Sequence, residues 1–567
     1  MMKRKYFLVS FIIFLFFSVN IDAQAETDYS VWVKNSLSKI KKREGFQFHP
    51  LSNNLIAEVK AAKNEYEAIQ LVLRSKSQEL KDIKILVTDL EGDEGNFIKK
   101  ENIKIFLENY VHIRKFTTSP GWYPDALVPY KNLDLISHTI QPIWISVFIP
   151  DHTNAGNYKG SIIIKPSNAE KITVTLKVTV WDFSLPKAPY LKTSFGIKLS
   201  YIAKRHKIPQ QSKELKDMRR IYNENAINHR VSPVCLIDPS IIEKDNSISI
   251  DFTDFDKEMQ HYLDLGLNSF AVCWHRFPPA FVKVSNKPLK NERITKRTRE
   301  ILKLTEEHLR EKGWLKLSRL YVIDEPRKEY FPQIKEIFTF FEDCAPDIKR
   351  LLTLDHRAFG SSSKPAYRDL AGYVDIWAVI TSAYHEGFLK ERQKMGEEVW
   401  WYVCCNSKHP YANFWAIDYP AIDHRIVFWQ AWKYNIEGFL YWAINYWEEN
   451  VWENPISFPG TNGDGSLIYW NKEGPVNSIR WEIIRDGIED YDYFCMLRNY
   501  ATELTKLDRD KKYTDLVDKA KELLDVSDLT PSLTEYTKQP QKLFNRREEI
   551  ANLIVEINHI INSEGKL

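Results

Sequence analysis

Short runs of alternating apolar and polar residues fill the first third of the chain. Examples are Ile69-Leu71-Leu73, Ile143 to Ile149 and Ile172 to Val180, and turn residues such as Asn154 to Asn157 separate such runs. Alternation with one apolar face is typical of strands that pack on one side. The pattern therefore predicts an all-β sandwich over residues 26–186, followed by a proline-rich linker at Leu185 to Pro189.

From about residue 190 the pattern changes to strands that alternate with amphipathic helices. Eight βα units over roughly 300 residues fit a (β/α)₈ TIM-type barrel over 187–495. An open doubly wound sheet is the alternative, but no glycine-rich phosphate loop follows the first strand. A helical region is expected over 496–567. The eight predicted strands are Lys192 to Leu199, His229 to Cys235, Ser269 to Trp274, Ser318 to Asp324, Arg350 to Asp355, Val374 to Ile380, Glu398 to Cys404 and Gly438 to Asn445.

Two segments between these elements have few signals of regular structure. Pro120 to Asp125 forms an aromatic loop in this prediction, and Tyr446 to Pro475 is a long loop that follows the eighth strand. Long loops in compact domains usually serve a function. The second loop is therefore expected to cover the carboxyl-terminal mouth of the barrel.

The amino terminus has the pattern of a secretory signal. Met1 to Lys5 is basic, Tyr6 to Val19 is apolar, and a site of the A-x-A type ends at Ala25. A retained membrane anchor is the alternative, but it needs about 20 apolar residues. We expect residues 1–25 to be removed and the mature protein to be exported, to the periplasm or outside the cell, without a membrane span.

Composition narrows the class of partner. The net charge of +3 and the lack of basic clusters argue against nucleic acid. The six cysteines show no metal-type spacing, although Cys404-Cys405 with His409 forms a weak candidate, and no cofactor is implied. Aromatic residues make up 13% of the chain, and tryptophans crowd between Trp377 and Trp481. Several must fill a core, but aromatic faces at a barrel mouth also suit carbohydrate.

The fourth predicted strand ends in two adjacent carboxylates, Asp324 and Glu325, followed by Pro326. Chemistry in parallel barrels gathers at the carboxyl ends of the strands. Neighbouring strand residues face opposite ways, so the two side chains can converge only if the chain turns out of the sheet. The other interpretation is a solvated turn pair, or a carboxylate paired with Arg319 or Arg327.

The seventh strand carries no acid at its end, where a conventional retaining glycosidase would place its nucleophile. A sugar with a 2-acetamido group supplies its own nucleophile, because the carbonyl oxygen of that group attacks the anomeric carbon. Glu325 would then be the general acid, its pKa raised by burial and by like charge. Asp324 would hold the amide N–H and stabilise the developing positive charge.

Other residues near predicted strand ends are candidates for binding the sugar, each against a structural alternative. Charged residues of the helix after the barrel, such as Arg480 and Asp490, are expected to form structural ion pairs instead. The substrate-binding candidates are Trp442, Asn445, Tyr384, His275 and Asp355.

The chain resembles the family 123 glycoside hydrolases over nearly all of its mature length. The motifs that carry this resemblance are Ala61 to Glu65, Val322 to Pro326, Asn462 to Gly465 and Arg480 to Tyr491. The resemblance implies an exo-acting β-N-acetylgalactosaminidase with a retaining, substrate-assisted mechanism, and the Asp-Glu pair of the family falls on Asp324 and Glu325.

Two other functions remain open from the sequence. One is a conventional two-carboxylate glycosidase in which Asp355 or Glu386 partners Glu325. The other is a glycan-binding protein of the same fold without turnover.

Overall fold

The computed structural model describes residues 28–42, 55–234, 236–245, 247–272, 292–358, 365–508 and 510–564. The predicted signal segment lies outside these residues. None of the helices within them is long and apolar enough to cross a membrane.

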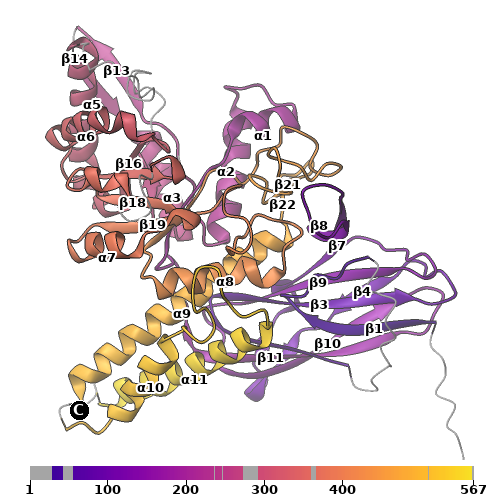
Figure 1. Cartoon of the computed structure of the whole chain (residues 1–567). Coiled ribbons are helices and arrows are strands. Elements are labelled where there is room, and N and C mark those ends of the chain that lie inside the picture. The colour runs from indigo at the N-terminus through magenta and orange to yellow at the C-terminus, as the bar shows by residue number, and fades with distance from the viewer. Residues whose placement is uncertain are drawn as a thin grey trace, which may run out of the picture.

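Two sheets build the amino-terminal domain, as the alternating pattern predicts (Figure 1). Their inner faces share one apolar core, to which Leu71 and Ile145 of one sheet and Ile162 and Leu176 of the other contribute. The first sheet is antiparallel and runs β1 (Tyr29–Asn35), β3 (Glu65–Ser75), β9 (Ile140–Ile149), β7 (Ile103–Ile113), β8 (Gly121–Pro129). The second runs β2 (Ile56–Lys63), β11 (Ile172–Ser184), β10 (Gly156–Lys165), β5 (Leu90–Glu91), β6 (Phe97–Ile98), with β4 (Lys84–Val87) beside β10.

The aromatic segment predicted as a loop is a strand, so that prediction is wrong. Residues from Gly121 onward form β8 at the edge of the first sheet, paired with β7. The indole of Trp122 stacks on the cross-strand imidazole of His112 at 4.4 Å. An edge strand tolerates proline, and Pro124 lies where the register shifts, so two prolines in the segment did not prevent a strand.

A barrel-like sheet of parallel strands forms the second domain. Segment 232–234 joins its two outermost strands: Phe195 N–H donates to Ser232 O at 3.0 Å, and Ala271 N–H donates to Val234 O at 2.8 Å. The strand order is β12 (Lys192–Phe195), β20 (Gly438–Tyr441), β19 (Glu398–Tyr402), β18 (Ile376–Ile380), β17 (Lys349–Leu354), β16 (Ser318–Ile323), β15 (Phe270–Ala271).

The predicted regular (β/α)₈ plan is met only in part. In the described part of His229 to Cys235 the pairing is a single parallel bridge between Pro233 and Phe195. Before it, Arg230 has a left-handed φ of 60°, and the side chains of His229 and Arg230 pair with acids of another helix. Between β17 and β18 the described residues form 3₁₀ turns and no α-helix.

Helices follow most strands of this domain, and two β-hairpins lie in its connecting segments. The hairpins are β13 (Ser240–Lys244) with β14 (Ser247–Asp251), and β21 (Tyr469–Trp470) with β22 (Pro475–Val476). The helices are α1 (Leu199–His206), α2 (Lys213–Asn228), α3 (Thr253–Leu265), α5 (Glu292–Glu311), α6 (Phe331–Cys344), α7 (Glu386–Lys394) and α8 (Ala421–Lys433).

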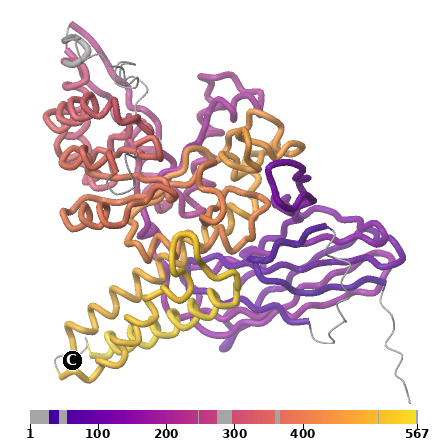
Figure 2. Tube along the Cα trace, in the orientation of Figure 1, coloured from indigo at the N-terminus to yellow at the C-terminus, as the bar shows by residue number. Residues whose placement is uncertain are grey.

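A 29-residue helix, α9 (Ile479–Leu507), connects the two domains and continues past the boundary predicted at residue 495. Its first turn is capped by Ser478, whose hydroxyl accepts from Trp481 N–H at 3.1 Å. With α10 (Thr514–Leu524) and α11 (Pro540–Glu564) it forms a bundle beside the sheets of the first domain (Figure 2).

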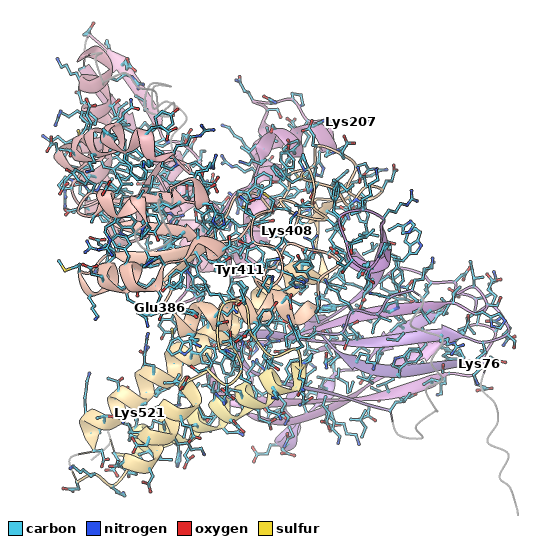
Figure 3. The ribbon with its side chains drawn as sticks, in the orientation of Figure 1. Lys76, Lys207, Glu386, Lys408, Tyr411 and Lys521 are labelled. Carbon is cyan, nitrogen blue, oxygen red and sulfur yellow. The ribbon has the colours of Figure 1, made fainter. Side chains whose placement is uncertain are left out.

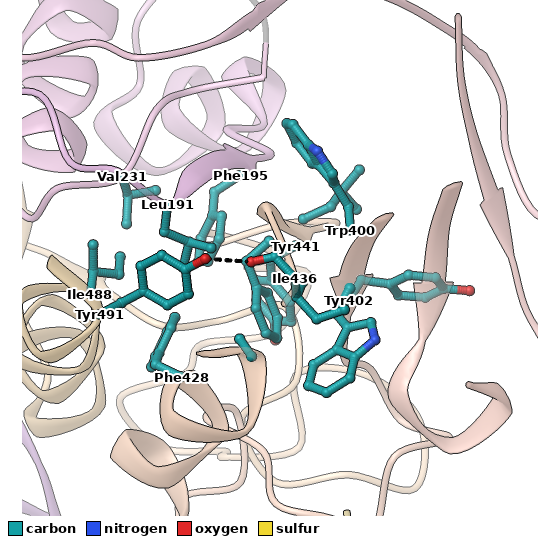
Figure 4. Packing of buried hydrophobic residues seen from close by; sticks show 14 of the residues in the cluster. Leu191, Phe195, Val231, Trp400, Tyr402, Phe428, Ile436, Tyr441, Ile488 and Tyr491 are labelled. Atoms are coloured by element: carbon teal, nitrogen blue, oxygen red, sulfur yellow. Dashed lines mark hydrogen bonds between the residues drawn. The ribbon is translucent and has the colours of Figure 1, made fainter. Parts of the chain in front are cut away.

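The core of the barrel-like domain packs aromatic side chains of the strands against α8 and α9. Figure 4 shows Phe195 and Tyr441 from the sheet with Phe428 of α8 and Ile488 of α9. In the same cluster the hydroxyl of Tyr491 donates to Ile436 O at 2.9 Å. Most tryptophans from Trp377 to Trp481 are buried here, so they stabilise the core and are not exposed for stacking on a sugar.

Candidate active site

The chain turns out of the sheet directly after β16, as convergence of the two carboxylates requires. The strand ends at Ile323, and Glu325 adopts a left-handed φ of 42°. Such a backbone conformation is uncommon outside glycine and is typical of strained functional turns. It brings Asp324 and the backbone of Glu325 to the same side chain, that of Thr353 in β17.

Hydrogen bonds fix the position of Asp324. Its Oδ1 accepts from the hydroxyls of Thr353 at 2.7 Å and Tyr321 at 3.0 Å. The Thr353 oxygen in turn accepts from Glu325 N–H at 2.9 Å. One hydroxyl thus links the two consecutive residues. Both described donors bind Oδ1, and the Asp324 side chain is exposed, so it can accept a further hydrogen bond from a ligand.

Glu325 is half-buried and has two partners. Its Oε1 accepts from the hydroxyl of Tyr402, at the end of β19, at 2.5 Å, and its Oε2 pairs with Arg357. Burial raises the pKa of Glu325, and the charges of Asp324 and Asp355 raise it further, while Tyr402 and Arg357 act against this. The net upward direction agrees with the sequence prediction and suits a general acid.

Asp355 follows β17 and is buried, but its oxygens are occupied. Oδ2 accepts from Nε of Arg357 at 2.7 Å, and Oδ1 accepts from the backbone N–H of Arg357 at 2.9 Å. Arg357 therefore lies between Asp355 and Glu325 (48% of its side chain is exposed). Asp355 acts through Arg357 rather than presenting a free oxygen to the mouth.

Four partners of the carboxylate pair were missed from the sequence: Tyr321, Thr353, Arg357 and Tyr402. The period-two alternation along β17 and β19 contains a signal for two of them. Thr353 shares a strand face with Asp355, and Tyr402 ends the strand that lacks an acid. The basic partners considered from the sequence are engaged elsewhere: Arg319 is buried against the Trp400 ring at 4.8 Å, and Arg327 pairs with Glu329.

Trp442 lies at the end of β20, half-buried, on the loop side of the mouth. Its Nε1 donates to Asp464 Oδ1 at 2.9 Å, and its ring contacts Tyr446 and Phe458 of the long loop. The backbone of Gly465 packs directly against the indole, since a Cβ at this glycine would fall 2.3 Å from the ring. This position is compatible with the predicted sugar-binding wall.

Asn445 and Tyr384 do not join the carboxylate pair. Asn445 is fully buried, and its amide accepts from Lys198 N–H at 2.8 Å and donates to Lys198 O at 3.1 Å, so it fixes the start of α1. Tyr384 packs on Trp401 at 5.2 Å, on the face of β19 opposite to Tyr402. His275 lies outside the described residues.

A buried arginine holds the long loop against the first domain. Arg480 of α9 donates to both carboxylate oxygens of Asp125 in β8, at 2.8 and 2.7 Å, and to the carbonyls of Gly463 and Ser466. Charged residues of α9 therefore serve structural ion pairs, as predicted. The loop that carries Asp464 is thereby fixed relative to both domains.

Among the described residues, no group of three or more His, Cys, Asp and Glu side chains is arranged to hold a metal ion. His409 instead pairs with Asp423 Oδ2 at 2.5 Å and stacks on Tyr419.

Comparisons with known proteins agree with this architecture. Glycoside hydrolase 123, catalytic domain, matches residues 218–497, and the Glycoside hydrolase 123 N-terminal domain matches residues 41–166. A comparison with curated proteins found no match.

Among solved structures, a family 123 glycoside hydrolase from Clostridium perfringens is similar at a TM-score of 0.69 and 18% identity, covering 94% of this chain and 99% of that one. A GH5 xyloglucanase from Bacteroides ovatus covers 80% of this chain and 100% of that one, with a TM-score of 0.28 and 10% identity, too low to support an argument.

The matches to the catalytic and N-terminal domain models show that this chain is a glycoside hydrolase. The chain belongs to glycoside hydrolase family 123. Carbohydrate is accordingly its substrate class.

Proposed function

We propose that this glycosidase removes terminal β-linked N-acetylgalactosamine, or a related 2-acetamido sugar, by a retaining, substrate-assisted mechanism. The observation that supports this most is the joint placement of Asp324 and Glu325 at the end of β16, while β19 ends at Tyr402 and is followed by Val403-Cys404-Cys405, without an acid. The nucleophile is then the acetamido oxygen of the sugar.

In the first step Glu325 protonates the glycosidic oxygen as the acetamido oxygen attacks the anomeric carbon. Asp324 accepts the amide N–H and stabilises the cationic bicyclic intermediate, with Tyr321 and Thr353 fixing the other carboxylate oxygen. In the second step Glu325 takes a proton from the water that opens the intermediate. The hydroxyl of Tyr402 keeps Glu325 oriented in both steps.

Glu325→Gln tests the role of the acid. We expect kcat/KM for a 2-acetamido galactoside with a poor leaving group to fall by roughly 10²–10⁴. The loss should be smaller for a nitrophenyl leaving group, because that group needs less protonation. Asp324→Asn should reduce hydrolysis of both substrates. Lack of turnover by the wild type on any 2-acetamido glycoside would refute the proposal.

A conventional two-carboxylate mechanism is distinguished by substrates with a 2-hydroxyl in place of the acetamido group. Asp355 is the candidate for the second carboxylate, because its charge raises the pKa of Glu325. Hydrolysis of 2-hydroxyl galactosides as fast as the acetamido substrates would favour that mechanism. Saturable sugar binding without product release would instead favour a glycan-binding protein.

The proposed function includes the kind of glycan that is cleaved and the export of the protein. The similar protein from C. perfringens is described as acting in glycolipid glycan hydrolysis, so glycolipid glycans are natural first substrates to assay. The basic and apolar segments before Ala25 support export. Amino-terminal sequencing of the protein recovered from fractionated cells tests this, and a mature chain that retains Met1 would exclude cleavage.

A further inference from the structure

Two consecutive cysteines occupy the strand end where a conventional glycosidase would carry its nucleophile. Cys404 and Cys405 follow β19, both are free thiols, and both are half-exposed. The Cys405 thiol donates to Asn406 Oδ1 at 3.8 Å, and the two thiols are close enough to influence each other's ionisation. The remaining described cysteines, Cys344 and Cys495, are buried and therefore much less accessible to reagents.

This pair lies within the environment of the carboxylate site. Cys405 is within electrostatic range of Glu325 and Asp464. Tyr402, two residues before the pair, donates to Glu325. Figure 3 labels Lys408 and Tyr411, from the loop that follows the pair, near the centre of the molecule.

The two thiols differ in character. The neighbouring Cys405 thiol raises the pKa of Cys404, as does burial, and the Cys404 thiol lowers the pKa of Cys405. The thiolate is the form that attacks a disulfide, so Cys405 is the nucleophile of the pair and Cys404 the resolving thiol.

We propose that Cys404 and Cys405 are a redox-active dithiol that a small-molecule disulfide such as oxidised glutathione converts to a vicinal disulfide beside the catalytic acid. The Cys405 thiolate attacks the oxidant, forming a mixed disulfide and releasing one glutathione. The Cys404 thiol then loses its proton and attacks the Cys405 sulfur, releasing the second glutathione. The protein loses two hydrogens, and both appear on the reduced glutathione.

Chain geometry makes this disulfide labile. Consecutive Cα atoms are about 3.8 Å apart, below the roughly 4.4–6.8 Å that disulfides prefer, so the ring is strained and easily reduced. Strained, accessible disulfides are typical of regulatory sites. The backbone of 404–405 must shift on closure, and this segment follows the strand end that carries Tyr402.

The chemical state of the pair is tested without reference to turnover. The full chain is reduced with dithiothreitol, freed of reductant and incubated with oxidised glutathione, and its peptides are then mapped by mass. We expect the peptide with both cysteines to lose two hydrogens and to recover them with dithiothreitol. A lasting glutathione adduct on Cys405, or unmodified thiols, would overturn the proposal. The map also follows Cys235 and Cys273, which lie outside the described residues.

The effect on catalysis rests on the proposed function and is measured separately. The ratio of oxidised to reduced activity on an aryl 2-acetamido galactoside should fall several-fold for the wild type. It should stay near one for Cys404→Ser and Cys405→Ser, whatever their basal rates. Equal ratios in all three proteins, with the disulfide confirmed by mass, would refute control of the site and leave the hydrolase assignment untouched.

Phenylarsine oxide gives an independent measure, because it bridges two neighbouring thiols and releases water. We expect one arsenical on residues 404–405 of the wild type and none there in Cys405→Ser. Failure of the wild-type pair to bind it would contradict a reactive, accessible dithiol.

Discussion

Two arginine–carboxylate pairs in this protein have similar chemistry and opposite surroundings. Arg480 and Asp125 are both almost fully buried, form two parallel hydrogen bonds, and further donors of Arg480 bind loop carbonyls. Arg357 and Glu325 lie at the barrel mouth, with 48% of the arginine side chain and 22% of the glutamate side chain exposed. The first pair joins the two domains, and the second contains the proposed general acid.

The difference in burial determines how much each pair costs to open. A buried pair must keep every partner, because removing one leaves a charge without solvent or counter-ion. A partly exposed pair loses little when it opens, since water replaces the partner. In the proposed mechanism Arg357 can therefore leave Glu325 when a substrate arrives, and Glu325 then takes up the proton that it donates.

The largest effect is expected at the buried pair. Arg480→Met leaves Asp125 buried without its partner and should lower the free energy of unfolding by about 3–5 kcal/mol, measured by urea denaturation. Arg327→Met, in the exposed pair of Arg327 with Glu329, is the control and should change it by about 0–1 kcal/mol. Equal losses in the two variants would show that burial does not separate these pairs.

The sequence indicated the carboxylate pair more clearly than the side chains that contact it. An apolar strand that ends in two acids is a local signal, so Asp324 and Glu325 were found without knowledge of the fold. Arg357 and Tyr402 reach Glu325 only through the register of β16 to β19, which no local pattern encodes. For the same reason Asn445, placed near the mouth by its strand position alone, binds the Lys198 backbone instead of facing the acid pair.

Structural ion pairs of the helix after the barrel were predicted, but the partners of its charged residues were not. The charges of α9 were expected to pair along the helix, and Arg485 with Glu482 does so. Arg480 instead pairs with Asp125, which is 355 residues earlier in the chain. Periodicity cannot report a contact of that separation, because both partners lie in regular elements whose spacing reflects only their own packing.

Asp464 extends the comparison to a buried carboxylate whose hydrogen-bond donors are not arginines. Asp464 accepts from Tyr441 and Trp442, and burial raises its pKa from 3.8 to about 6. Between about pH 4 and 6 the folded state keeps a proton that the unfolded state has lost. Stability from this group therefore falls as pH rises through that window, by up to roughly 3 kcal/mol.

Asp464→Asn removes this titration. The difference in unfolding free energy between wild type and variant, followed by denaturation at several pH values, should shift against the wild type as pH rises from about 4 to 6. Parallel pH curves for the two proteins would show that Asp464 titrates normally in the folded state.

The exposed pair should influence pH dependence more than stability. Arg357 lowers the pKa of Glu325, so Arg357→Met should raise it, and the acid should stay protonated to higher pH. The alkaline limb of the pH profile of kcat/KM should therefore move to higher pH. Arg327→Met, an exposed neighbour that pairs with Glu329, is the control and should leave the limb in place. An unchanged limb in Arg357→Met would mean that Glu325 is not the titrating acid.

The smallest effect is expected at Glu386, the alternative partner considered for Glu325. It begins α7, is half-exposed, and pairs with Lys390 one turn later on the same helix. An exposed pair of this type contributes about 0.3–0.5 kcal/mol, so Glu386→Gln should barely change the unfolding free energy. Its kcat/KM on a 2-acetamido substrate should equal that of the wild type. A loss as large as that of Glu325→Gln would place Glu386 in the chemistry, and the sugar would then not be the nucleophile.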